Sequence, residues 1–94
     1  MHKETVEIYS DATNQAVMRH PARKFPGVLI QGDSLHALCV KADTVCSEGR
    51  DALSPDGYSE MNSIRNALWE MLNHYAAVLG EHDIPVPYSN KPDL

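Results

Sequence analysis

The sequence has few of the features that mark membrane-spanning or exported proteins. No apolar run approaches the roughly 20 residues that a helix needs to cross a bilayer. The N-terminal segment, residues 1–7, is too polar for a signal peptide. We therefore expect a protein with no membrane span, and we place it in the cytoplasm.

Cysteine is scarce, with only Cys39 and Cys46 in 94 residues. If both lie on one helix, their Cα atoms are about 10 Å apart along the axis, whereas a disulfide needs less than about 7 Å. We predict two reduced cysteines in the core. The five histidines and two cysteines include no closely spaced ligand pair of the kind that is typical of a zinc site. We therefore expect no metal and no cofactor, with His36 and His74 at the surface.

Basic residues are also in the minority. Eight Lys and Arg stand against thirteen Asp and Glu, which gives a net charge of −5. Such a surface disfavours wrapping a nucleic-acid backbone, and it would suit a basic protein partner. The length of 94 residues allows one domain, residues 1–94, with one modest core.

Three segments have the pattern of β-strands. Residues 5–10 alternate apolar and polar side chains, and residues 15–19 follow them after a run of turn-forming residues. Residues 27–31 form a continuous apolar run, which is typical of a central strand. Pro21 and Pro26 bracket a basic loop and keep it outside the sheet ladder.

Two helices are predicted next. Asp33 or Ser34 can cap the first, and Ser54 followed by Pro55 signals the start of the second. Gly80 is the expected C-cap of the second helix. The first helix has an apolar stripe at Leu35, Leu38, Cys39, Ala42 and Cys46. The stripe of the second helix is Met61, Ile64, Leu68, Met71, Leu72, Tyr75 and Leu79.

The tail, residues 84–88, is too rich in proline for a central strand and forms either an edge strand or an extended clamp. Strands followed by helices predict an α+β fold. We expect a three-stranded antiparallel sheet with two helices on one face and an extended C-terminal tail.

The letters Gly32-Asp33-Ser34-Leu35 are those of the GDSL hydrolases, whose serine is the nucleophile. The similarity ends there, because the chain lacks that family's Gly-x-Asn-Asp element and its only Asp-x-x-His overlaps the motif. On a helix, His36 and Ser34 point away from one another, so no base for a nucleophile is in reach. We interpret the motif as a glycine turn and helix start, and we expect no catalytic residue and no enzyme.

A longer stretch resembles the HicB-like antitoxins. Phe25-Pro26-Gly27 leads into Gln31-Gly32-Asp33-Ser34-Leu35, and residues 83–89 are similar to that family's Pro-rich end. The resemblance implies a small, commonly dimeric sheet-and-helix domain that neutralises a small RNA-cleaving toxin, although the long second helix departs from the pattern. The chain also resembles a family of small uncharacterised bacterial proteins with an Arg-x-Phe-Pro-Gly and Gln-Gly-Asp-Ser-Leu core, which implies no function.

The loop after the second predicted strand concentrates positive charge. Its candidate partner-binding residues are Arg19, His20, Arg23 and Lys24. Such a group can grip a phosphate or an acidic partner. The alternative is a solvated surface loop without a role.

The second predicted helix has an apolar arc of about 180° around Leu68, which is wider than one small sheet requires. The excess either packs on the first helix or forms a dimer interface, where aromatic residues concentrate. We predict a homodimer that buries Trp69 or Tyr58. The function that we expect is a non-enzymatic protein-interaction module, antitoxin-like or immunity-like, for a small basic protein. The alternative is a homodimeric domain that binds a small ligand.

Overall fold

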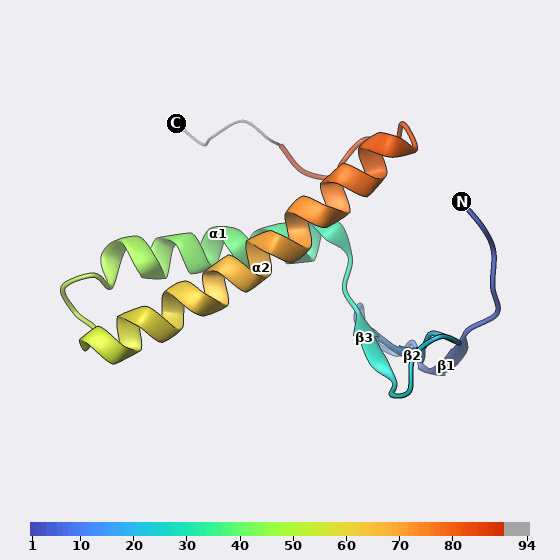
Figure 1. Ribbon diagram of the computed structural model, residues 1–94, viewed down its shortest axis with the longest axis horizontal. Coiled ribbons are helices and arrows are strands. Elements are labelled where there is room, and N and C mark those ends of the chain that lie inside the picture. The colour runs from blue at the N-terminus through green and yellow to red at the C-terminus, as the bar shows by residue number, and fades with distance from the viewer. Residues whose placement is uncertain (90–94) are drawn as a thin grey trace. The chain divides into compact units, whose positions relative to one another are not determined.

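Three short strands open the chain in the computed structural model, which describes residues 1–89 (Figure 1). They are β1 (Glu7–Ser10), β2 (Ala16–Arg19) and β3 (Gly27–Leu29), paired antiparallel in the order β1-β2-β3. The prediction that residues 27–31 form the central strand is wrong. The strand in this run ends at Leu29, and the chain continues into a helix that begins at Gly32. The central strand is β2, which pairs with a strand on each side.

Alternation along the strands separates the two faces of this sheet. Glu7 lies opposite Arg19, and their side chains form an ion pair on one face. Ile8 lies opposite Met18 on the other face. Leu29, through its pairing with Ala16, shares that second face, which is therefore apolar.

Two helices form a hairpin, with α1 spanning Gly32–Glu48 and α2 spanning Pro55–Glu81 (Figure 1). The start of α2 was predicted correctly. The Ser54 hydroxyl accepts the Gly57 N–H at 3.1 Å, and Pro55 is the first helical residue. A cap of this kind stabilises a helix by about 1 kcal/mol. At α1, the carboxylate of Asp33 accepts the N–H of Ser34 at 2.8 Å.

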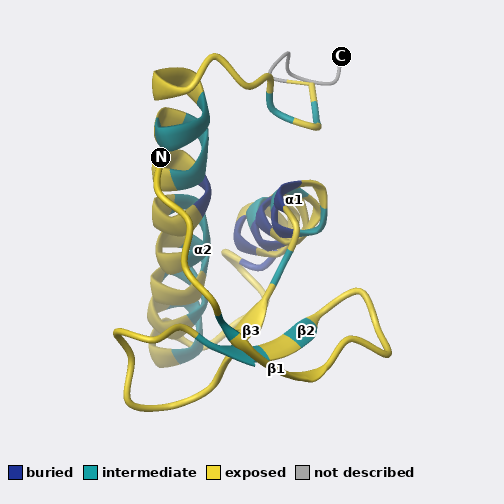
Figure 2. Cartoon of the chain, turned by 90° about the vertical axis from the view of Figure 1, so that its right-hand side faces the viewer, coloured by how far each residue is buried: buried dark blue, intermediate teal, exposed yellow. Residues whose placement is uncertain are grey.

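The core of the hairpin comes mainly from α1 (Figure 2). Its buried apolar side chains are Leu35, Cys39, Ala42, Cys46 and Leu72. Both cysteines are free and buried, as predicted. Leu38 was predicted in the same stripe but is exposed, because it lies at the flank of the helix and not at the centre of the buried face.

The end of α2 differs from the prediction. Gly80 lies inside the helix, and Asp83 takes the left-handed conformation with φ of 56°. The N–H groups of His82 and Ile84 both donate to the Leu79 carbonyl, which closes the last turn. The tail that follows lies against α1, where the Tyr88 ring stacks on His36 with a centroid separation of 4.3 Å. Of the two predicted forms of the tail, this contact fits the clamp.

The architecture is α+β, as the sequence predicted. The chain divides into two compact units, and we call residues 1–31 the sheet unit and residues 32–89 the helical unit. Placement of both helices on one face of the sheet, and the single domain over residues 1–94, stay predictions. Within the described residues, no helix has the length and hydrophobicity to cross a membrane.

Candidate functional site

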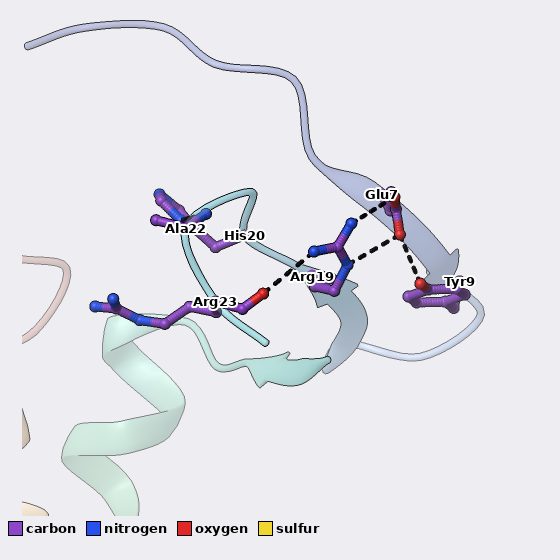
Figure 3. Close-up of polar contacts among 6 residues, drawn as sticks. All are labelled: Glu7, Tyr9, Arg19, His20, Ala22 and Arg23. Carbon is purple, nitrogen blue, oxygen red and sulfur yellow. Dashed lines mark hydrogen bonds and ion pairs between the residues drawn. The ribbon is translucent and has the colours of Figure 1, made fainter. Parts of the chain in front are cut away.

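Arg19, at the end of β2, organises the basic loop (Figure 3). Its guanidinium donates two hydrogen bonds to the Glu7 carboxylate, from Nη2 to Oε1 at 2.7 Å and from Nε to Oε2 at 3.1 Å. A third bond runs from Nη1 to the carbonyl of Arg23 at 3.2 Å. Arg19 therefore joins β1, β2 and the loop, and most of its donors are used inside the sheet unit.

Glu7, the acidic residue of this group, binds a proton more weakly than an ordinary glutamate does. Hydrogen bonds from Arg19 and Tyr9, together with the charge of Arg19, lower the pKa of Glu7 from 4.5 to about 2. The Tyr9 hydroxyl donates to Oε2 at 2.6 Å. The same carboxylate raises the pKa of Arg19. The pair thus stays ionised across the physiological pH range.

A tight turn follows β2. The N–H of Arg23 donates to the carbonyl of His20 at 2.9 Å, and the N–H of Ala22 donates to His20 Nδ1 at 3.0 Å. Because Nδ1 acts as an acceptor, the proton of the neutral ring sits on Nε2. The turn therefore leaves the Nε2 edge of His20 to serve as a donor.

A pocket of about 220 Å³ lies within the sheet unit beside this turn. Its lining residues are Val6, Met18, His20, Arg23, Phe25, Gly27, Val28 and Leu29. Three apolar side chains are largely exposed: Phe25 at 72%, Val28 at 65% and Leu29 at 52%. The ammonium group of Lys24 lies 5.4 Å from the centroid of the Phe25 ring. The pocket is thus apolar, with cationic groups at its rim.

This arrangement can hold an apolar side chain and an anionic group together. The apolar lining would take the side chain, while Arg23 and Lys24 would attract a nearby carboxylate or phosphate. Of the four residues predicted from the sequence, His20 and Arg23 line the pocket, Lys24 lies beside it over Phe25, and Arg19 holds the loop. The apolar lining escaped prediction, because its members come from separate segments that only the antiparallel pairing brings together.

The two residues predicted at a dimer interface lie in the helical unit. Trp69 Nε1 donates to Asp43 Oδ1 at 2.9 Å, and the same oxygen accepts a bond from Arg65 Nε at 2.6 Å. Trp69 therefore packs on α1, which is the alternative to the dimer that the sequence left open. At Tyr58, hydrogen bonding with Arg50 and then with Asn62 lowers the pKa of the phenol.

The motif Gly32-Asp33-Ser34-Leu35 forms the first turn of α1. Gly32 packs so closely on the ring of Tyr75 that a side chain at this position would collide with it. The glycine thus has a packing role, and His36 is occupied by its stack with Tyr88. Within residues 1–89, no three His, Cys, Asp or Glu side chains gather as a metal site would require.

Comparison with known families covers nearly the whole chain. The chain belongs to the family of unknown function DUF6959, which matches residues 1–88. This agrees with the resemblance to small uncharacterised proteins. It gives no support to the resemblance to HicB-like antitoxins. No curated protein and no solved structure matches the sequence.

Proposed function

We propose that this member of DUF6959 is a non-enzymatic protein-interaction module that binds a partner through its sheet unit. The observation that carries the proposal is the apolar pocket of the sheet unit, where Phe25 and Leu29 are exposed next to the cations Arg23 and Lys24. Contiguous exposed apolar surface with a polar rim is typical of interaction sites.

The size of the pocket favours a protein partner over a small ligand. Pockets for small molecules usually measure about 300–1,000 Å³ and enclose most of the ligand, whereas this one measures about 220 Å³. It has room for one apolar side chain of a partner. At this pocket, the alternative function, a homodimeric domain that binds a small ligand, therefore has weaker support.

Charge acts on two scales in this proposal. The whole chain carries a net charge of −5, which would attract a small basic protein over several ångströms of approach. The rim of the pocket is cationic, so the segment that docks there would carry an acidic group beside its apolar anchor. An antitoxin-like or immunity-like inhibitor in the cytoplasm would have this behaviour.

The test is capture of a partner by the full chain, with variants that separate the site from the rest of the surface. We expect tagged wild-type protein to retain one partner in stoichiometric amount from a lysate of its source organism. Phe25→Ala, which removes the ring at the pocket, should reduce the retained amount at least about tenfold, as truncation of a central aromatic anchor does. Arg23→Ala should lower the retained amount of partner and make retention less dependent on salt concentration.

Ile84→Ala is the matched control, because Ile84 is also an exposed apolar residue but lies in the tail. It should retain the partner as the wild type does. Recovery of the bait alone would contradict the proposal. Equal loss in Phe25→Ala and Ile84→Ala would show that the partner recognises some other surface.

A further inference from the structure

The helical unit exposes five large apolar side chains along α1 and α2, and four of them share one face. The exposed fractions are 42% for Leu38, 44% for Val45, 54% for Ile64 and 51% for Met71. We call these four residues the hairpin patch. A hairpin of two helices has one shared seam, and these positions lie beside that seam.

The two patch residues of α1 lie on the same side of the helix. Successive residues on a helix are about 100° apart, so Leu38 and Val45 lie about 70° to 90° to one side of the buried stripe. That stripe has Cys39 and Ala42 near its centre. Asp43 lies about 70° to the other side. The α1 part of the patch therefore points away from the side that carries Asp43.

The same division holds on α2. Ile64 and Met71 lie about 80° to 100° to one side of the buried Leu72, while Trp69 lies about 60° to the other side. Trp69 donates its indole N–H to Asp43 across the hairpin. Since that bond joins the polar sides of α1 and α2, all four patch residues lie on the opposite face of the hairpin.

The spacing of the patch repeats on both helices. Leu38 and Val45 are seven residues apart, as are Ile64 and Met71, which is about 10.5 Å along each axis. Because the helices are antiparallel and Arg65 meets Asp43, Val45 is level with Ile64 and Leu38 with Met71. The four apolar side chains mark the corners of a rectangle. A two-fold axis lying in the plane of the patch would therefore place the patch of one chain face to face with the same patch of a second chain.

The size of this face fits a dimer. The 17 residues of α1 run for about 25 Å, and two adjacent helices are about 20 Å wide. Such a face covers about 500 Å² in projection, to which the relief of the side chains adds, against the roughly 800 Å² per partner that standard interfaces bury. Repeats of seven residues are also those of helices that pack side by side in bundles.

From these observations we infer that the hairpin patch is the interface with a second copy of this chain, which would form a four-helix bundle. Leu38, Val45, Ile64 and Met71 would be its apolar centre. The proposal moves the interface from Tyr58 and Trp69, which lie on the polar face, to the face opposite. It concerns a surface separate from the sheet-unit site, so either proposal can fail without the other.

The experiment measures the mass of the full chain by light scattering and sedimentation from 1 to 100 µM. The wild type should show twice the chain mass of 10.4 kDa at the upper concentrations. Leu38→Glu combined with Ile64→Glu should raise the dissociation constant of the dimer roughly a hundredfold or more, because unpaired carboxylates would be buried at the contact. Far-UV circular dichroism verifies that the variant keeps its helices.

Val40→Glu is the matched control. Val40 has the same exposed fraction as Leu38, 42%, on the same helix, but it lies on the other side of the buried stripe. This variant should dimerise like the wild type. A wild-type chain that is monomeric at 100 µM would overturn the proposal. So would a dimer that Leu38→Glu with Ile64→Glu leaves intact, or one that Val40→Glu weakens equally. A monomer destabilised by Leu38→Glu alone would indicate that the same chain covers this face.

Discussion

At the scale of single residues, Glu7 links the charge of the sheet unit to its stability. Its pKa is about 2 in the folded chain and 4.5 as the ordinary value. A lowered folded pKa stabilises the folded state above pH 4.5, and this contribution is lost as the pH falls toward 2. We expect NMR titration of the Glu7 carboxylate to give a midpoint near 2, with the sheet unit loosening over that pH range.

Arg19→Met provides the control for this titration. The variant removes the two hydrogen bonds and the positive charge that lower the pKa of Glu7, so the midpoint should move toward 4.5. A Glu7 midpoint that stays near 4.5 in the wild type would show that the ion pair does not persist in solution. The basic loop, which Arg19 holds through the Arg23 carbonyl, would then lose its anchor to β1.

At the scale of elements, two glycines of the helical unit are in contrasting surroundings. A Cβ atom on Gly32 would collide with the ring of Tyr75, whereas a Cβ atom on Gly80 would meet nothing within 4 Å. We therefore expect Gly32→Ala to lower the free energy of unfolding by about 1–3 kcal/mol, the usual cost of overpacking. Gly80→Ala should raise it by about 0.5–1 kcal/mol, because alanine is the better helix former.

Urea unfolding of the two variants measures both effects. The collision predicts a further result: in a Tyr75→Ala background, Gly32→Ala should cost little or nothing. If Gly32→Ala is as harmless as Gly80→Ala in the wild-type background, α1 and α2 do not approach as closely as the structure has them. Which of the two substitutions lowers the free energy of unfolding more thus tests the packing of the hairpin.

The elements also show which features a single sequence can predict. The start of α2 was predictable because Ser54, Pro55 and the Gly57 N–H lie within one turn. Its end was not, because Asp83 takes the left-handed conformation in place of the expected glycine. The basic loop was predicted, but the pocket beside it depends on strand pairing. Likewise, the bond from Trp69 to Asp43 spans 26 residues, and no local pattern encodes it.

At the scale of the whole molecule, the sheet unit is too small to account for its own stability. It has 31 residues and none of the chain's cysteines. Domains below about 40 residues usually need disulfides, metals or association in order to fold, and many of its apolar side chains are exposed. We therefore expect its order to depend on the rest of the chain or on a partner. The first case is the single domain that the sequence predicted.

These two cases give different unfolding behaviour. We expect the case in which the sheet unit depends on the rest of the chain. Trp69 fluorescence reports the helical unit, and amide hydrogen exchange of β2 reports the sheet. In one cooperative domain, both probes give the same free energy of unfolding, since coincident transitions mark two-state behaviour. If the β2 amides instead exchange at a much lower free energy than the Leu72 region, the sheet opens independently. Because partner binding would then have to supply the missing stability, the same exchange experiment with the captured partner present should slow β2 selectively.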